Sequence, residues 1–324
     1  MLRRYALFGF IFALTVLLAA CIPAPTPLPT ATLVPPTPSP VPPTPTPPSV
    51  TITDSAKRTV TIPGVPQRIV SLAPSTTEIA FALGLGPRVV AVDSYSDYPA
   101  ETKDLPKLKT FPVSMEQLVS FKPDLILAAG VTGPDEIKKM EDLNLTILVV
   151  GVSSSSFDDI FADISLVGQA TGTQAQAKQL TETMRNKVAE IKGIVAKAKD
   201  KPRVYWELDA TDPTKPYTPG PGSFIDGLIA LAGGTNIAAA AKTTWAQLNA
   251  EEIVASNPDI IILSDTAYGI TVESVKARPG WSTISAVKND KVLPIEDNLV
   301  SRPGPRVVDG LAAAAKLIHP ELFK

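Results

Sequence analysis

The apolar residues of this chain form two alternating patterns from residue 50 onward. Some runs are short, continuous and rich in β-branched residues, which is typical of strands buried on both faces of a parallel sheet. Between them lie amphipathic stretches with apolar residues three or four positions apart, which predict helices. We therefore expect an α/β fold. The clearest predicted strands are Arg68–Leu72, Leu125–Ala128, Thr146–Val150 and Ile260–Leu263.

An internal repeat predicts two similar lobes. Segment 114–127 is matched 135 positions later by segment 249–262. Each copy has a helix-capping residue, a glutamate two residues on, a helix with one apolar face, a Pro-Asp break and a buried strand. Two copies this far apart indicate two lobes with parallel sheets, not a solenoid. Asp124 and Asp259, which follow the prolines, are interpreted as turn residues.

One long helix is expected to join the lobes. Residues 173–199 contain no proline, and their apolar residues recur every three or four positions. A helix of about 27 residues spans ~40 Å, enough to run along both lobes. A single stiff connector of this kind should permit only modest closure. The predicted organisation is an N-terminal lobe at 50–172, a connecting helix at 173–199 and a C-terminal lobe at 200–324.

The first twenty residues have the pattern of a secretory signal. Arg3 and Arg4 precede an apolar run at 5–20, about four residues short of the ~20 that a membrane-spanning helix needs. The sequence Leu-Ala-Ala-Cys that ends at Cys21 resembles the lipobox of bacterial lipoproteins, whose cysteine is alkylated with diacylglycerol after the peptide before it is removed. The alternative is an uncleaved anchor helix with an incidental cysteine. We expect 1–20 to be removed and Cys21 to hold the protein at the outer face of the cell membrane.

Residues 21–49 are expected to form a tether. Positions 22–49 contain 13 prolines and six threonines, and proline lacks the amide donor that helices and sheets require. In the polyproline II conformation, at ~3.1 Å per residue, these residues would reach roughly 85 Å. The segment predicts a semi-rigid spacer and says nothing about a ligand.

Composition narrows the classes of function. The formal charge is -2, so no large basic field is available to hold nucleic acid. Cys21 is the only cysteine and His319 the only histidine. A disulfide within the chain and a metal site built on several cysteines or imidazoles are therefore excluded. Neither a nucleophile–base pair nor a phosphate-binding glycine loop is evident, so we expect no enzyme activity.

Several motifs resemble one family, the helical-backbone (class III) periplasmic-binding proteins of ABC importers for corrinoids, ferric siderophores and haem. The resemblance covers nearly all of the chain from Arg68 to the C-terminus, and it lies nearer to the cobalamin-binding branch because of the segment 94–99 and the pair Trp245 and Gln247. It implies a ligand captured between the lobes, a permease and ATPase complex as partner, a monomeric protein and no resident cofactor. The other motifs are 68–78, the two repeats, 222–226 with 232–236, 278–281 and 302–306.

Four aromatic residues are candidates for contact with a ligand. Tyr95, Phe111, Tyr217 and Trp245 each fall in a predicted loop beside Gly, Pro or Ser. A lone aromatic in a loop more often covers a core, but the resemblance implies that these four line the ligand site. Flat side chains suit a corrin macrocycle, a broad apolar plate. Two positions depart from the cobalamin-binding member of the family. Phe111 and Ala129 each stand where the resemblance implies a tryptophan, which favours a pocket that is shallower, binds more weakly or has a different shape.

Polar candidates come from two segments. Pro74 and Ser75 follow a predicted strand, at the end of a parallel sheet where ligands bind, while Ser75 and Glu78 also fit a capping box. The resemblance implies that Asp297, Asn298 and Arg302, in a C-terminal loop, contact ligand side chains. Arg302 is equally plausible as a structural clamp on a neighbouring carboxylate.

The repeat also places Glu116 and Glu251 at equivalent positions. Both are compatible with solvated glutamates that the helix dipole favours. The resemblance instead implies that each meets an arginine of the permease, setting docking register more than affinity.

Two further classes of protein were weighed. A ferric-siderophore or haem-binding protein of the same family differs only in the chemistry of its ligand site, and haem ligation by His319 is disfavoured because this residue is remote from the predicted ligand loops. A structural or adhesive surface protein would share the tether but would not need two sets of strand-end loops.

Overall fold

A computed structural model describes residues 49–152 and 156–323. These residues belong to one compact unit, Thr46–Lys324. The predicted signal at 1–20, Cys21 and all but the last residue of the predicted tether at 21–49 lie outside the described residues.

The first lobe is built on a five-stranded sheet in the order β5-β4-β3-β6-β7, and all its pairings are parallel. Alternate residues of its central strands face two separate clusters, one formed with α1 and α4 and the other with α2 and α3. Helices thus cover both faces, which explains why the strands are continuous apolar runs. The elements are β1 (Val50–Thr53), β2 (Thr59–Ile62), β3 (Ile69–Ser71), α1 (Pro74–Ala82), β4 (Val89–Asp93), β5 (Lys107–Leu108), α2 (Met115–Ser120), β6 (Leu125–Ala129), α3 (Pro134–Asp142), β7 (Ile147–Val150) and α4 (Phe157–Thr171).

The second lobe has a four-stranded parallel sheet in the order β10-β8-β12-β13 and a separate antiparallel pair, β9 and β11. One face of the larger sheet packs on α6 and α11, and the other packs on α7, α8 and α9. The elements are β8 (Arg203–Glu207), β9 (Tyr217–Pro219), α6 (Phe224–Leu231), β10 (Thr235–Asn236), β11 (Trp245–Gln247), α7 (Ala250–Ser256), β12 (Ile260–Leu263), α8 (Val272–Lys276), α9 (Ser285–Lys288), β13 (Val292–Pro294), α10 (Asp297–Val300) and α11 (Val307–Ile318).

The sequence repeat corresponds to the centre of each sheet. Ile69 of β3 pairs with Leu125 of β6, and Val204 of β8 pairs with Ile260 of β12, so both partners are displaced by the same 135 positions. The prediction of two similar α/β lobes with parallel sheets is confirmed.

The aspartates of the repeat bridge neighbouring strands. Asp124 accepts the amides of Gln67 and Arg68 at 2.7 and 2.8 Å. Asp259 accepts the amide of Arg203 at 2.9 Å and the guanidinium of the same residue at 3.0 Å. Each carboxylate therefore fixes the start of the adjacent strand, β3 or β8. This bridging role adds to their interpretation as turn residues, since each aspartate lies in a bend directly before a strand.

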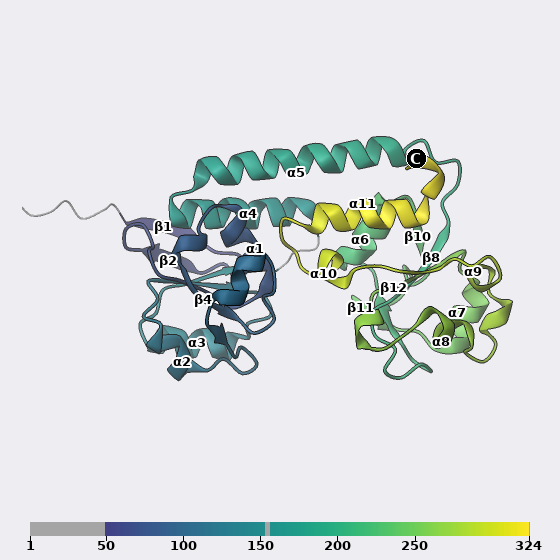
Figure 1. Ribbon diagram of the computed structural model, residues 1–324, viewed down its shortest axis with the longest axis horizontal. Coiled ribbons are helices and arrows are strands. Elements are labelled where there is room, and N and C mark those ends of the chain that lie inside the picture. The colour runs from purple at the N-terminus through teal and green to yellow at the C-terminus, as the bar shows by residue number, and fades with distance from the viewer. Residues whose placement is uncertain (1–48, 153–155, 324) are drawn as a thin grey trace, which may run out of the picture. The chain divides into compact units, whose positions relative to one another are not determined.

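The connecting helix is α5 (Gln174–Val195), which runs along both lobes (Figure 1). It packs on α4 of the first lobe and on α11 of the second, and one hydrophobic cluster beneath it includes residues from both. The helix ends about one turn before the predicted Lys199. The amides of Ala196, Lys197 and Ala198 bond to carbonyls of the last helical turn and close the helix as a tight turn.

Candidate ligand-binding surface

Two aromatic residues lie together at the carboxyl edge of the first sheet. Tyr95 follows β4 and Phe111 follows β5, both in loops as predicted. Tyr95 is 61% exposed and Phe111 55% exposed, and their ring centroids are 6.2 Å apart. Large apolar side chains are usually buried more deeply than this when they serve only a core. The pair forms an apolar patch that is available for contact.

A buried hydrogen-bond network holds the loop that carries Tyr95. The carboxylate of Asp93, at the end of β4, accepts the Tyr95 amide at 2.9 Å and the Ser96 hydroxyl. Ser96 lies 2.8 Å from the Thr77 hydroxyl, which donates to Ser71 at 2.8 Å. Burial raises the pKa of the Asp93 carboxyl, although the bonds from Ser96 and Tyr95 act in the opposite direction.

Arg302 links the second lobe to the same loop. Its Nη1 lies 2.5 Å from Asp97 Oδ1, and its Nη2 donates to the Tyr95 carbonyl at 3.3 Å. The hydrogen bond from Arg302 lowers the pKa of Asp97. This arginine is therefore the structural clamp that was one of its two interpretations, and its contact with a ligand stays a prediction.

A second arginine of the same segment pairs with a buried carboxylate. Glu78 accepts bonds from Arg306 Nε at 3.0 Å and Nη2 at 2.6 Å, and this pairing is the main cause that raises the Arg306 pKa. The Arg306 guanidinium also stacks on the ring of Tyr98, 3.9 Å from its centroid. The predicted capping box of Ser75 and Glu78 is wrong, because α1 begins two residues earlier than the box requires and Ala73, not Ser75, is its N-cap.

The two strand-end residues differ in accessibility. Pro74 is the first residue of α1 and is partly exposed, whereas Ser75 is only 8% exposed. Gly304 packs against Ser75 and Glu78. A β-carbon at position 304 would lie 3.5 Å from the Ser75 carbonyl oxygen and 3.4 Å from Glu78 Oε2. The Arg302–Arg306 segment therefore covers this end of α1.

In the second lobe, the predicted aromatic residues lie on strands. Tyr217 begins β9 and Trp245 begins β11, so their placement in loops was wrong. The register pairs Trp245 with Pro219 and Gln247 with Tyr217, which places both aromatics on one face of the two-stranded ribbon. Tyr217 is 43% and Trp245 58% exposed, while the intervening residues of both strands are buried. The ribbon therefore presents an aromatic face to solvent.

The residues that follow β8 bond to the first strand of this ribbon, since the Leu208 amide donates to the Tyr217 carbonyl at 2.9 Å and the Tyr217 amide donates to the Asp209 carbonyl at 2.8 Å. A buried charged cluster, which sequence reasoning missed, begins at the last residue of β8. Glu207 pairs with both terminal nitrogens of Arg278, at 2.5 and 2.8 Å, and accepts the Tyr205 hydroxyl at 3.0 Å. Asp265, 1% exposed, accepts the Ala210 amide at 3.1 Å, but among the described residues its Oδ1 has no hydrogen-bond partner. Burial, followed by the charge of Glu207, raises the pKa of Asp265 to about 6.

The polar residues before Arg302 occupy a short helix, not a loop. Asp297 and Asn298 open α10 and are partly exposed. Asp297 accepts the hydroxyl of Ser301. Burial raises the pKa of Asp297, with the Ser301 bond and the Arg302 charge acting against it.

Glu116 and Glu251 occupy equivalent places in the first turns of α2 and α7. Both are exposed, and in the part of the chain that the structure describes neither forms a salt bridge. Their helix caps differ, because Asn249 forms a full capping box with Glu252 whereas the Ser114 side chain makes no capping bond.

We also looked among the described residues for a metal site, an accessible histidine and a membrane-spanning helix. They contain no group of three or more His, Cys, Asp or Glu side chains suited to a metal ion. His319 is 1% exposed, with Nε2 3.2 Å from the Gly233 carbonyl and Nδ1 3.1 Å from Glu321. None of the helices searched, all from described residues, combines the length and apolar character of a membrane span.

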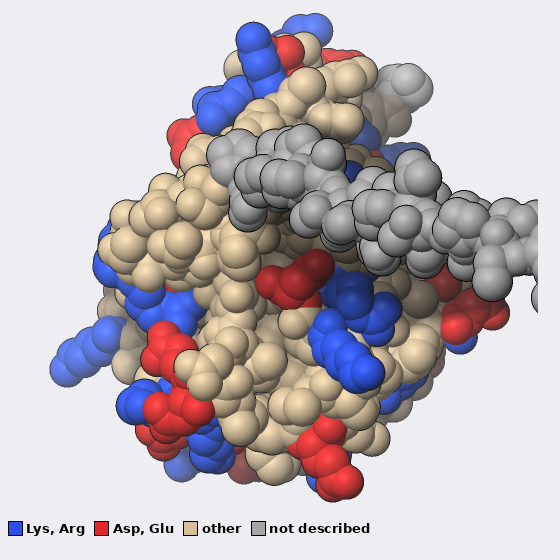
Figure 2. All heavy atoms as spheres, turned by 90° about the vertical axis from the view of Figure 1, so that its left-hand side faces the viewer, with Lys and Arg blue, Asp and Glu red and all other residues tan. Residues whose placement is uncertain are grey.

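Charge is mixed on the face shown in Figure 2. Among the residues drawn in blue, red and tan, acidic and basic side chains are interspersed, and neither sign of charge forms a continuous surface. This agrees with the near-neutral composition.

The structure thus brings Tyr95, Phe111 and Arg302 together, and separately joins Tyr217 with Trp245. Glu78, Arg278 and Arg306 lie inside motifs described above, but Glu207 and Asp265 lie in none of them, so the sequence carried no signal for the Asp265 cluster. Two parallel α/β lobes on one long helix, with solvent-facing aromatic residues on each lobe, define a two-lobed binding protein of the helical-backbone type.

Comparison with known proteins agrees with that class. The family described as periplasmic binding protein matches residues 69–299, and the chain belongs to this family. Its members are substrate-binding proteins of transport systems, which confirms the expectation that the chain is not an enzyme.

Individual relatives differ in what they bind. The chain is 38% identical over 283 residues to the uncharacterized ABC transporter substrate-binding lipoprotein YvrC of Bacillus subtilis, covering 85% of this chain and 87% of that protein. It is 30% identical over 254 residues to a vitamin B12-binding protein of Vibrio cholerae, covering 77% and 88% respectively. The structure of the periplasmic heme-binding protein RhuT from Roseiflexus sp. RS-1, in its apo form, aligns with a TM-score of 0.72 at 27% identity, over 79% of this chain and 99% of that one.

Proposed function

We propose that this chain is the substrate-binding lipoprotein of an ABC importer and that it captures cobalamin or another corrinoid between its two lobes. The observation that carries the proposal is the pair of exposed aromatic groups, Tyr95 with Phe111 and Tyr217 with Trp245. In Figure 1, α1 and β11 lie on the sides of the two lobes that face each other. Ligands of open α/β sheets bind outside the carboxyl ends of the strands, where the Tyr95 and Phe111 loops lie.

The chemistry of a corrinoid matches these side chains. A corrin ring is a broad apolar plate fringed by amides, so aromatic residues from two lobes can pack on its two faces. Each aromatic side chain that becomes buried contributes on the order of 1–3 kcal/mol. The polar fringe would meet Asp297, Asn298 and Arg302, with Pro74 and Ser75 bordering the site.

Delivery to the membrane complex depends on other residues. We assign Glu116 and Glu251 to docking on the permease, because both are exposed, occupy equivalent positions of the two lobes and form no salt bridge with any residue that the structure describes. Two such contacts would set the register of docking while adding little affinity. Lipidation at Cys21 and a tether at 21–49 would keep a monomeric protein beside its permease and ATPase, on the outer face of the membrane.

Calorimetric titration of the purified protein tests the ligand class. Cyanocobalamin, cobinamide, haemin and a ferric catecholate should be compared at equal concentrations, and we expect saturable heat from one or both corrinoids. Binding of haemin or the ferric complex without binding of either corrinoid would overturn the corrinoid assignment and leave the transport class intact. If all four failed to bind, the aromatic groups would lose their proposed role.

A further inference from the structure

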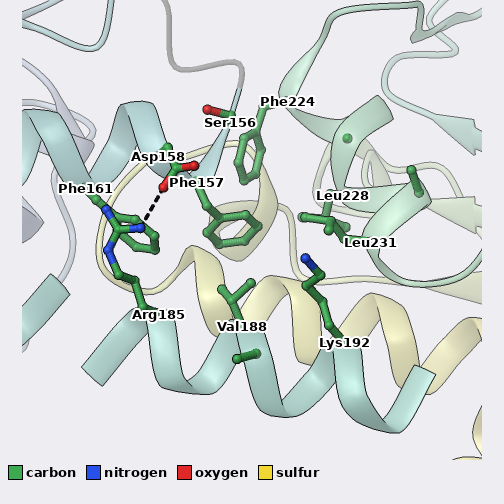
Figure 3. Close-up of a pocket in the computed structure, with 13 residues that line it drawn as sticks. Ser156, Phe157, Asp158, Phe161, Arg185, Val188, Lys192, Phe224, Leu228 and Leu231 are labelled. Atoms are coloured by element: carbon green, nitrogen blue, oxygen red, sulfur yellow. Dashed lines mark hydrogen bonds and ion pairs between the residues drawn. The ribbon is translucent and has the colours of Figure 1, made fainter. Parts of the chain in front are cut away.

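A cavity of about 690 Å³ lies between α4, α5 and α6, and it shares no residue with the proposed corrinoid site (Figure 3). Small-molecule sites in proteins commonly have volumes of roughly 300–1,000 Å³. Its walls come from the first lobe through α4, from the second lobe through α6, and from the connecting helix α5. An occupant would therefore contact both lobes and the helix that joins them.

The walls of the cavity are aromatic and aliphatic. Phe157 meets Phe224 edge-to-face, with centroids 5.3 Å apart, and lies 6.2 Å from Phe161. Val188 and Leu231, which are partly exposed, extend the apolar surface. An occupant that displaces water from these side chains gains hydrophobic stabilisation, and a flat aromatic body can match the ring edges and faces.

Of the two basic side chains that line the cavity, only one is paired with a carboxylate of the described residues. Arg185 Nη1 lies 2.7 Å from Asp158 Oδ1, and the Arg185 guanidinium stacks on Phe161 at 4.3 Å from the ring centroid. Lys192, two turns further along α5, points toward the cavity in Figure 3 and has no carboxylate partner among the described residues. With two cations and one carboxylate, the lining carries a net charge of +1.

We infer that this cavity is a second binding site, specific for an aryl acid: a flat aromatic body that carries one carboxylate or sulfonate. The ring system fills the space bounded by Phe157, Phe224 and Leu231, and the acid group pairs with Lys192. The paired Arg185 and Asp158 close the other end without contributing free charge. This site goes beyond the proposed function, because it requires neither a corrinoid nor a permease.

Calorimetric titration of the full-length protein with 2-naphthoate, beside the neutral analogue 2-naphthalenemethanol, tests both parts of the inference. We expect naphthoate to bind with one-to-one stoichiometry and the neutral analogue to bind at least threefold more weakly. Lys192→Gln should weaken naphthoate about two- to fivefold, the range for an exposed ion pair, and leave the neutral analogue unchanged. Lys178→Gln, on the same helix outside the cavity, is the matched control and should change neither.

A filling variant tests the location. Ala189 lines the cavity on the exposed side of α5, so Ala189→Phe should occupy the space without disturbing the core and should weaken both probes at least tenfold. Ala175→Phe, also exposed on α5 but outside the cavity, should bind like the parent protein, and circular dichroism verifies that both variants fold. Absence of naphthoate binding, equal affinity for the two probes, or unchanged affinity in Ala189→Phe would each overturn the inference.

Discussion

Replacing Asp265 by asparagine should stabilise the protein, and the gain should grow with pH. The carboxyl is 1% exposed and lies near Glu207, so its ionisation in the folded state is unfavourable and its pKa rises from 3.8 to about 6. A group whose pKa is raised by folding contributes most stability when it is protonated, and this contribution is lost as the pH rises through the folded-state pKa.

The rise in the pKa of Asp265 from 3.8 to about 6 sets the size of this effect. At 1.36 kcal/mol per unit, ionisation of Asp265 costs the folded protein about 3 kcal/mol at pH 8, and about half of that at pH 5. An asparagine keeps an oxygen that can accept the Ala210 amide, and it carries no charge that Glu207 could oppose. The difference in stability between Asp265→Asn and the parent should therefore increase by about 1.5 kcal/mol between pH 5 and pH 8.

Urea unfolding, followed by tryptophan fluorescence at several pH values, measures this difference. Trp206 and Trp281 are fully buried in the same lobe and report on its unfolding. Comparison of the two proteins at each pH cancels the contributions of other titrating groups. A stability difference that stays constant from pH 5 to pH 8 would refute the reasoning.

Three further outcomes are expected. Arg306→Met should lower the free energy of unfolding by about 3 kcal/mol, because a buried carboxylate loses both hydrogen bonds from its main partner and keeps only Arg302, 3.9 Å away; urea unfolding would show it, and a loss below about 1 kcal/mol would contradict it. Trp245→Ala should weaken the binding of whichever corrinoid the parent binds roughly 5- to 100-fold by calorimetry, whereas Leu143→Ala, exposed at the end of α3, should not, and equal losses would count against an aromatic contact. Reversing charge at both Glu116 and Glu251 should leave ligand affinity intact and abolish uptake into permease vesicles; unchanged uptake would remove their docking role.

The repeated units were predictable because their signal is local and duplicated. Buried parallel strands are continuous apolar runs. The spacing of 135 positions between the two sequence repeats is also the spacing between the paired residues of the two sheets. The ribbon of Tyr217 and Trp245 was not predictable as strands, since each strand has three residues, too few for alternation to be distinguished from a loop.

Long-range polar contacts escaped the sequence for a different reason. Glu78 fitted a capping pattern three residues after Ser75, yet its partner Arg306 lies 228 positions away. Local spacing can identify a cap or a turn, but it contains no information about which distant cation a carboxylate meets. The bridging aspartates and the Asp265 cluster were missed for the same reason.

The pairing of Glu78 with Arg306 has a consequence for how the chain matures. The carboxylate lies in α1, near the start of the described residues, whereas the arginine immediately precedes α11, near their end. A chain that emerges from its N-terminus would have to leave this carboxylate without its counter-ion until almost the whole polypeptide was available. The contact between Glu78 and Arg306 is therefore among the last of the first lobe to form, although the strands and helices around Glu78 are complete in the chain much earlier.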